Sequence, residues 1–238
     1  MERLDKILSS QGICSRKDVK TLIKNKRVKI NGAFPPKSDI KLDPEHDTIE
    51  IDGSPVIYRK YIYIMMNKPQ GVLSASSDSR DTTVVDLLPE ELKRKSLFPA
   101  GRLDKDTTGL LIITDDGAFA HNMLSPKKHV PKLYHAVLDG DLTDSSKHIL
   151  ENGITLNDGT VYKPASIGFL DSRHEVSVEI CEGKFHQVKR MFEFVGLTVV
   201  KLKRIRIGNL KLDESLNKGD CRLLSNDELT AIWDSNNS

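Results

Sequence analysis

The sequence contains few of the residues that crosslink a fold or bind a structural metal. Its 238 residues include three cysteines, Cys14, Cys181 and Cys221, and no C-x-x-C pair. An odd, scattered set is typical of reduced thiols in a cytoplasm and argues against a disulfide framework or a zinc site. The seven histidines also lack the spacing of metal ligands. We therefore expect a cytoplasmic protein with no metal site.

Long hydrophobic runs are absent as well. The opening segment MERLDKILSSQG has no apolar signal-peptide core, and no run approaches the roughly 20 residues of a membrane span. Hydrophobic residues make up 38% of the chain and charged residues 29%, which is typical of a globular protein. The length allows one large domain, or a small domain followed by a medium one. We expect no membrane association.

Positive charge is concentrated at one end of the chain. The formal net charge of the whole protein is +2, whereas residues 1–41 hold eleven Lys and Arg against four acids, a local net charge of +7. A basic end on an otherwise balanced protein is typical of polyanion binding, and nucleic acid is the first candidate. The alternative is an ordinary solvated helix face.

The basic end has the pattern of a small module with two helices and a few strands. Gly12 should end the first helix, and Ser15 is a good N-cap for the second. Asn31-Gly32 is a strong hairpin-turn signal. The expected elements are helices over 3–9 and 16–25 and strands over 28–30 and 48–51.

This module resembles the small RNA-binding module named for the fourth small-subunit ribosomal protein, the alpha-L motif. The matching residues are Arg3-Leu4-Asp5-Lys6, Gly12, Ser15-Arg16 and Val28-Lys29-Ile30-Asn31-Gly32. The resemblance implies an RNA-binding domain over 1–57, followed by a linker over 54–60. It also implies phosphate or RNA contacts by six basic residues: Arg3, Lys6, Arg16, Lys17, Lys26 and Arg27.

The rest of the chain, over 60–233, reads as a second domain in which strands outnumber helices without alternating regularly with them. That order favours an α+β domain with a mixed, mostly antiparallel sheet over a parallel βαβ stack. Expected strands cover 61–66, 110–113, 133–138, 161–170, 175–181, 197–202 and 205–207. Expected helices follow Asp116, span 143–150 and 186–195, and begin at the capping box Ser225–Glu228, with a helical turn over 84–88 and a disordered tail over 234–238.

The segment Gly101–Gly117, GRLDKDTTGLLIITDDG, carries the strongest motif. A turn that leads into a strand does not need Arg102 and Asp104 together, because burying either charge without a partner is costly. An exposed ion pair of little energetic value is the alternative. The segment resembles the signature loop of the RNA pseudouridine synthases, and most of all that of the family that modifies single ribosomal RNA uridines.

Three further segments match that family in its order along the chain. They are Asn67–Gly71 for the first motif, Lys132-Leu133-Tyr134 for the tyrosine segment and Glu182–Phe192 for the third motif. Each is weak alone, but the four matches together span about 60–210. The resemblance implies the pseudouridine synthase fold for this domain.

The resemblance also implies an isomerisation that uses one carboxylate and no cofactor. Breaking the nitrogen–carbon glycosidic bond of uridine and rejoining the uracil through carbon involves no redox step and no added group. Asp104 would act as a nucleophile toward the sugar or as a base that removes a sugar proton, and the sequence leaves both routes open. A carboxylate that stays ionised in a closed cleft needs a nearby cation. The third motif gives Lys189 that role, with Arg190 as the alternative.

Two more residues have roles in this reading. Tyr134 would stack on the extruded base and place its hydroxyl near carbon 5, although a core tyrosine is the commoner case. Arg102 would hold open the gap that the extruded base leaves behind. Each role is implied by the resemblance.

Several other polar residues receive lesser roles. Asp106, Asp115 and Asp116 read as structural, and a metal site at Asp104-x-Asp106 lacks a third ligand with sensible spacing. This reaction needs no histidine, so the residues His121, His129, His135 and His186 are expected to be solvated or hydrogen-bonded. Lys127 and Lys128, in a basic loop before Tyr134, and Arg190 are expected RNA contacts.

The sequence therefore predicts a monomeric, cytoplasmic rRNA pseudouridine synthase. Its spellings Met66–Pro69, Asp106–Gly109 and Thr114–Gly117 resemble the small-subunit branch, so the expected partner is 16S rRNA or a partly assembled small ribosomal subunit. The alternatives are a 23S rRNA synthase and a non-catalytic RNA-binding ribosome-assembly factor. Intact Asp104, Tyr134 and Lys189 argue against the silent factor.

Overall fold

The computed structural model describes residues 1–125 and 127–234. The chain forms two compact units: an N-terminal unit of Met1–Ile62 with Leu88–Leu97, and a large unit of Tyr63–Leu87 with Phe98–Ser238. The domains predicted from the sequence, 1–57 and 60–233, are meant as pieces that fold independently. Their boundaries stay predictions.

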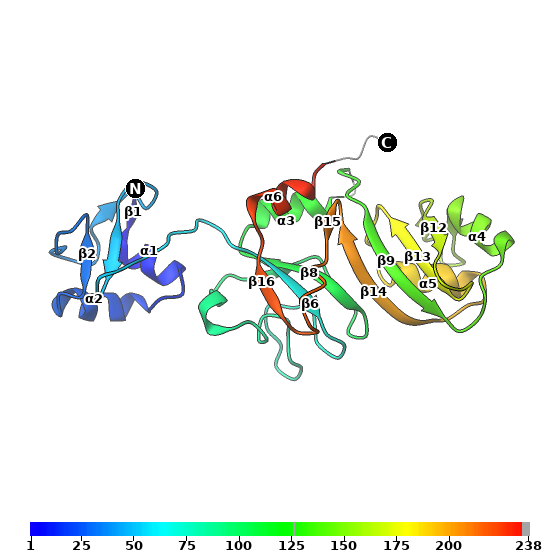
Figure 1. The fold of residues 1–238 in the computed structure, drawn as a ribbon, viewed down its shortest axis with the longest axis horizontal. Helices are drawn as coiled ribbons and strands as arrows, with labels where there is room; N and C mark the ends of the chain where they lie inside the picture. The colour runs from blue at the N-terminus through cyan, green and yellow to red at the C-terminus, as the bar shows by residue number, and fades with distance from the viewer. Residues whose placement is uncertain (126, 235–238) are drawn as a thin grey trace. The chain divides into compact units, whose positions relative to one another are not determined.

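The N-terminal unit packs two short helices against small strands (Figure 1). Its elements are β1 (Glu2–Arg3), α1 (Leu4–Ser10), α2 (Arg16–Lys24), β2 (Val28–Ile30), β3 (Lys41–Leu42), β4 (Ile49–Ile51) and β5 (Ser54–Pro55). Ser15 caps α2 as predicted, in a capping box completed by Asp18. The core consists of buried aliphatic residues from these elements: Leu4, Ile7, Leu8, Val19, Val28, Leu42 and Ile49.

The turn at Asn31-Gly32 is confirmed by positive φ angles of 49° and 79°. The strand that pairs with β2 is β4, and β4 also pairs with β5. The linker predicted over 54–60 is therefore wrong at its start, because Ser54 and Pro55 belong to a strand. Asp52-Gly53, also at positive φ, makes that tight connection possible.

The large unit is built on one twisted sheet with the strand order β12-β13-β9-β14-β8-β6-β16, and β7 and β15 pair at its margins with β8 and β14. Among the described residues, β14 and β8 pair in parallel and every other strand pair of this sheet is antiparallel. The predicted α+β class is confirmed. The strands are β6 (Tyr63–Lys68), β7 (Phe98–Ala100), β8 (Thr108–Thr114), β9 (Lys132–Leu138), β12 (Ser166–Phe169), β13 (Glu175–Ile180), β14 (Val199–Ile207), β15 (Leu210–Lys211) and β16 (Cys221–Leu223).

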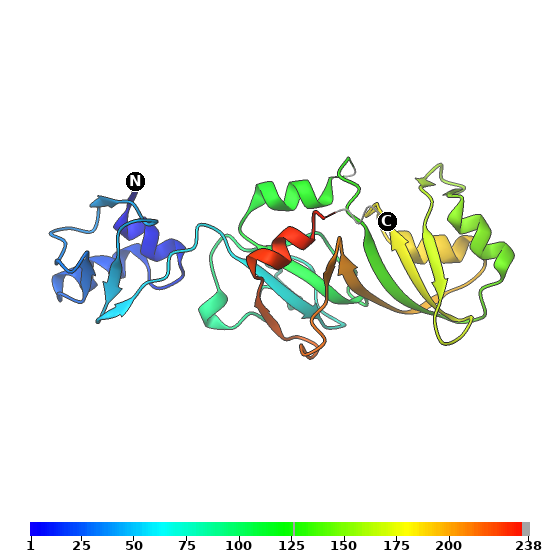
Figure 2. The same ribbon diagram turned by 45° about the horizontal axis from the view of Figure 1, so that its top comes forward.

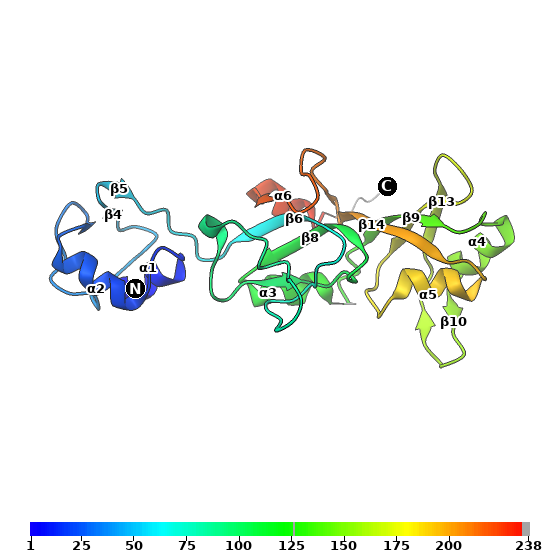
Figure 3. The same ribbon diagram turned by 90° about the horizontal axis from the view of Figure 1, so that it is seen from below.

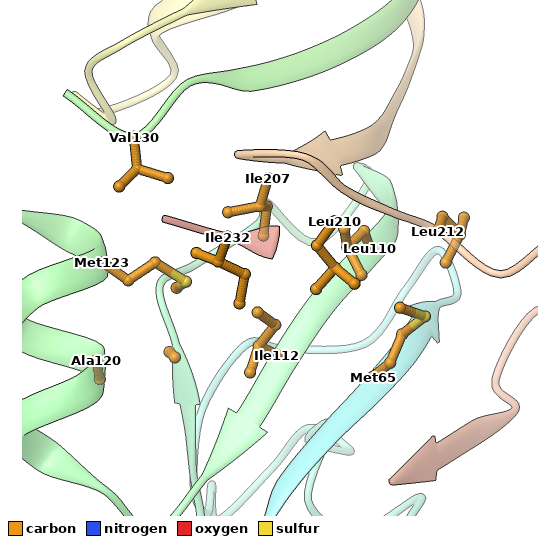
Figure 4. Packing of buried hydrophobic residues seen from close by; sticks show 11 residues of the cluster. Met65, Leu110, Ile112, Ala120, Met123, Val130, Ile207, Leu210, Leu212 and Ile232 are labelled. Atoms are coloured by element: carbon orange, nitrogen blue, oxygen red, sulfur yellow. The ribbon is translucent and has the colours of Figure 1, made fainter. Parts of the chain in front are cut away.

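Helices cover parts of this sheet. The remaining elements of this unit are α3 (Gly117–Leu124), α4 (Asp144–Glu151), β10 (Ile154–Thr155), β11 (Val161–Tyr162), α5 (Gln187–Phe194) and α6 (Asn226–Ala231), whereas η1 (Glu90–Leu92) belongs to the N-terminal unit. The yellow-green α4 and the gold α5 lie at the β12–β13 end of the sheet (Figure 2). Helix α3 packs on the β8 face, where Ala120 and Met123 meet Leu110, Ile112 and the α6-flanking Ile232 (Figure 4). Figure 3 shows α3 and α5 on the same side of the sheet.

Three predicted elements differ from the structure. The strands expected over 197–202 and 205–207 are one strand, β14, whose register shifts between Arg204 and Arg206. Conversely, the strand expected over 161–170 is split into β11 and β12 around Pro164, which has no amide hydrogen for a ladder. The helical turn over 84–88 is a run of turns and not a helix.

The predictions for the C-terminal part of the chain can also be compared with the structure. The capping box at Ser225 and Glu228 is confirmed and begins α6. Of the tail expected to be disordered, all but Asp234 lies outside the described residues. Within the described part of the chain, no helix is both long and apolar enough to cross a bilayer.

Candidate active site

The Asp104 loop connects β7 to β8 and is held from below by a buried lysine. Lys68, at the end of β6, is 0% exposed. Its Nζ donates hydrogen bonds to the backbone oxygens of Asp104 (3.0 Å), Thr107 (3.0 Å) and Pro69 (3.1 Å). Burial lowers the pKa of Lys68 to about 8, opposed by the charges of Asp106 and Asp104. The ammonium group fixes the backbone on which the Asp104 side chain stands.

Lys189, on the first turns of α5, reaches the Asp104 side chain. Its Nζ lies 3.1 Å from Asp104 Oδ2, although the two residues are 85 positions apart in sequence, and this contact was predicted. Arg190, the alternative, instead pairs with Asp158 on the other side of the helix. Of the two cations, Lys189 is therefore the one that pairs with Asp104. The roles of both residues in the reaction stay predictions.

Asp106 belongs to the same cluster. The sequence analysis expected only a structural role for Asp106 and did not predict this contact. Lys189 Nζ lies 2.5 Å from Asp106 Oδ1, so one ammonium bridges two carboxylates. The hydrogen bond from Lys189 lowers the pKa of Asp106 despite partial burial. Burial lowers the pKa of Lys189, but its bonds to Asp106 and Asp104 outweigh that effect and the pKa is raised. Lys189 therefore stays protonated.

A pocket of about 420 Å³ opens in front of Asp104, between α5 and the end of α3. The four predicted catalytic residues all line it, together with two buried basic residues: Arg102, Asp104, Lys132, Tyr134, Lys189 and Arg204. Tyr134 is buried on β9, opposite Arg204 of β14 in the sheet register. Arg102 is exposed. The pocket thus offers a buried ring at the sheet and an exposed guanidinium in the same lining.

A histidine that the sequence analysis set aside lies beside the carboxylate. His186 Nε2 is 3.4 Å from Asp104 Oδ1, and its backbone is left-handed, with φ of 48°. Its ring stacks on that of the exposed Phe185, with centroids 3.8 Å apart. The position is partly exposed, and its closeness to Asp104 was not predicted, because no local pattern signals a contact between α5 and this loop.

The predicted RNA contacts of the N-terminal unit fall into two groups. Arg3 and Arg27 are held in two-pronged contacts by Asp5 and Asp52, and Lys6 lies near Glu2. The other three, Arg16, Lys17 and Lys26, are exposed, and no ion pair is recorded for them in the described residues. The second group presents its charge to solvent, as phosphate contacts require.

The remaining predicted contacts lie in the large unit. Lys127 and Lys128 are exposed in the loop after α3. Residue Pro126 of that loop lies outside the described residues. For metal binding, the described part of the chain contains no cluster of three or more His, Cys, Asp or Glu that could hold an ion. The possible pair Asp104 and Asp106 binds the Lys189 ammonium instead.

A carboxylate paired with a lysine, a buried tyrosine and a pocket thus lie together on one mixed sheet, and comparison with known sequences shows the class of protein. Residues 62–194 match the family model described as RNA pseudouridylate synthase, and residues 2–33 match the S4 domain. The chain belongs to the RNA pseudouridylate synthase family and is an RNA pseudouridine synthase.

Its relatives narrow the group within that family. An uncharacterized RNA pseudouridine synthase of Bacillus subtilis is 49% identical over 95% of this chain and 96% of its own length. The ribosomal small subunit pseudouridine synthases A of Yersinia pestis and Escherichia coli K12 are 40% and 38% identical, each over 97% of this chain and over 97% and 99% of their own lengths. A solved pseudouridylate synthase structure is 35% identical, with a TM-score of 0.67, over 98% of this chain and all of that one.

Proposed function

We propose that this enzyme isomerises one uridine of 16S ribosomal RNA to pseudouridine, with the Asp104 carboxylate as the reacting group. The observation that carries the residue assignment is the ion pair between Lys189 and Asp104 inside the pocket that Tyr134 lines. The choice of RNA is supported by the two small-subunit synthases that match this chain over almost its whole length.

The residues fit the steps of the reaction. Asp104 either attacks C1′ of the target nucleotide or removes the C2′ proton, and in both cases the N1–C1′ bond breaks. The detached uracil turns and its C5 bonds to C1′, while the bond between Asp104 and C1′ breaks or, on the other route, C2′ takes its proton back. The C5 proton then leaves. Tyr134 supports the base and its hydroxyl lies near C5. No atom is added and no electron acceptor takes part, so the reaction needs no cofactor.

Lys189 and Arg102 serve the steps before bond breaking. Lys189 holds the Asp104 carboxylate in place and supplies its counter-charge in a site that water leaves when a base enters. Arg102, exposed in the pocket lining, holds the helix gap while the nucleotide is out of its stack, which costs a few kcal/mol.

The N-terminal S4 domain grips the RNA away from the target. The exposed cations Arg16, Lys17 and Lys26 contact phosphates, aided by Lys127 and Lys128 of the large unit. Because bases are read best where they are already splayed from a helix, the substrate is a partly assembled small subunit or its folded 16S rRNA, and not a short free strand. The enzyme acts as a cytoplasmic monomer.

The direct test offers purified enzyme unmodified 16S and 23S rRNA, each with and without ribosomal proteins, and maps pseudouridine at single positions. We expect one modified uridine, in 16S rRNA. Modification confined to 23S rRNA would overturn the choice of substrate and support the alternative read from the sequence.

The residue assignment has its own test in two carboxamide variants. Asp104→Asn should abolish tritium release from uracil-labelled rRNA at saturating enzyme. Asp81→Asn is the matched control, since it removes an exposed carboxylate that pairs with Lys105 of the same loop, and it should keep activity within tenfold. If Asp104→Asn also stays within tenfold of the unmodified enzyme, Asp104 is not the reacting group.

A further inference from the structure

Two buried cations in the pocket wall have no recorded ion pair with an acid among the residues that the structure describes. Lys132 is 6% exposed and Arg204 4% exposed, and both line the pocket with Asp104 and Tyr134. Arg204 Nε donates to the Leu110 backbone oxygen at 2.8 Å, but its Nη2 is buried without a hydrogen-bond partner. For the Lys132 ammonium, no hydrogen bond or ion pair is recorded among the described residues.

Such a pair is costly for the fold. Two like charges away from water, with no counter-charge, destabilise one another and lose solvation. Burial and the nearby Arg204 charge lower the pKa of Lys132 to about 8, and the Cys181 thiol opposes them. The lining carboxylates are already engaged, since Asp104 pairs with Lys189 and Glu182 with Lys184 at 3.1 Å. Two unpaired cations that destabilise the fold and line a pocket indicate that an anion arrives there with the substrate.

The two cations flank the tyrosine that supports the base. Lys132 and Tyr134 are two residues apart on β9, so their side chains lie on the same face of the sheet. Arg204 is the register partner of Tyr134 on the neighbouring strand β14. A uracil held against the Tyr134 ring therefore has its edges within the part of the pocket that both cations line.

We propose that Lys132 and Arg204 bind the carbonyl oxygens of uracil and stabilise the uracil anion that exists while the base is detached. This inference rests on the proposed function. When the N1–C1′ bond breaks, its electron pair stays on the base, and the charge spreads over N1 and the C2 and C4 oxygens. The sugar carbon meanwhile bonds to the Asp104 carboxylate, or Asp104 takes the C2′ proton. The pair returns to the sugar when C5 bonds to C1′. In that step the ester bond to Asp104 breaks, or C2′ takes its proton back from Asp104, and the C5 proton then leaves.

Lys132→Met tests the cation with little change in shape. Removing a buried, unpaired charge should raise the midpoint of thermal unfolding, because the methionine side chain suits the apolar surroundings. The single-turnover rate on uridine-containing rRNA transcript should fall about 100-fold, the effect of losing one preorganised donor to a developing anion. A lysine needed only for the fold would give the opposite stability result.

A better leaving group should make the reaction rate depend less on the Lys132 ammonium. Fluorine at C5 withdraws electrons and stabilises the detached anion by itself, so transcripts made with 5-fluorouridine need less help from the protein. We expect the Lys132→Met loss on these transcripts to be less than tenfold. Because C5 then carries no hydrogen, the rate is followed as consumption of the fluorinated nucleoside in digests of the RNA.

Lys203→Met is the matched control. Lys203 is an exposed lysine on β14, one residue before Arg204 and on the opposite face of the sheet. Its replacement should change the rates on the two transcripts by the same factor.

Two outcomes overturn the inference. They are a Lys132→Met protein that is less stable than the parent, and a rate loss that is equal on uridine and 5-fluorouridine transcripts. Failure of the parent enzyme to form pseudouridine in any rRNA would instead refute the proposed function.

Discussion

Lys68→Met should uncouple RNA binding from catalysis. Lys68 touches neither the reacting atoms nor solvent, but it joins the Asp104 loop to β6 through hydrogen bonds to the backbone oxygens of Asp104 and Thr107, and it also binds that of Pro69. Methionine keeps most of the side-chain volume and removes only the donor group. The Asp104 oxygen still accepts from the Thr107 amide at 3.1 Å, so the carbonyl oxygens that lose their partner are those of Thr107 and Pro69.

The size of the effect follows from two opposing terms. A buried carbonyl left unpaired costs about 1–3 kcal/mol, so the two together cost about 4 kcal/mol in free energy of unfolding. Removing a desolvated ammonium returns about 3 kcal/mol, which corresponds to the lowering of its pKa from 10.5 to about 8. The net loss is about 1 kcal/mol, or a midpoint of thermal unfolding lower by roughly 2–4 °C for a unit of this size.

The kinetic expectation concerns kcat. A carboxylate displaced by about 1 Å can lose about 100-fold in rate, while the phosphate contacts that bind the RNA are unaffected. Single-turnover tritium release and filter binding of the same rRNA measure the two quantities separately. We expect the rate to fall about 100-fold and the dissociation constant to change less than threefold.

Lys105→Met provides the control in the same loop. Lys105 forms an exposed ion pair with Asp81 at 2.8 Å, and such pairs contribute less than about 1 kcal/mol. A Lys68→Met enzyme with the stability and rate of the Lys105→Met enzyme would refute the reasoning. So would a loss that lies entirely in RNA affinity.

Three further predictions concern other parts of the molecule. Gly109→Ala should destabilise the large unit by about 3 kcal/mol in urea unfolding, since a Cβ would lie 2.2 Å from the Arg204 backbone oxygen at a φ of +100°; wild-type stability would contradict the β8–β14 contact. Deleting residues 1–57 should weaken rRNA binding and flatten its salt dependence, because exposed phosphate contacts are lost; an unchanged slope would indicate a protein-binding role for the S4 domain. Between pH 8 and 10 folded Lys132 binds fewer protons than unfolded Lys132, so this residue makes the free energy of unfolding rise with pH. In Lys132→Met the change in free energy of unfolding with pH should therefore be smaller, by about 1.4 kcal/mol per pH unit. Urea titrations measure it, and equal pH slopes in the two proteins would show that Lys132 titrates normally.

The sequence allowed the main elements and the central ion pair to be predicted, for different reasons. Helix α2 follows from a local signal, the cap at Ser15. The contact between Lys189 and Asp104 came from the resemblance of the third motif to that of the family, since no rule of local structure connects residues in different elements. Strand β14 was read as two because Lys203 and Arg204 interrupt its apolar pattern, and only the pocket explains why Arg204 is buried.

Other errors had signals that went unused. Pro164 marks the break between β11 and β12. Lys68 closes an apolar strand, where an unpaired lysine would be costly, so its burial could have been suspected. The closeness of His186 and Asp106 to the reacting carboxylate had no such signal, because it depends on how α5 approaches the loop.

Lys189 forms ion pairs with two carboxylates, and this matters during the catalytic cycle. Under the proposed function Asp104 loses its negative charge midway, either by forming an ester with C1′ or by accepting a proton. A lysine paired with Asp104 alone would at that moment become an isolated cation in a cleft closed by RNA. Asp106, which lies against the same ammonium and is 60% exposed, remains ionised throughout. Lys189 thus keeps a counter-ion at every step, and neither α5 nor the loop has to move to restore neutrality before the uracil rejoins the sugar.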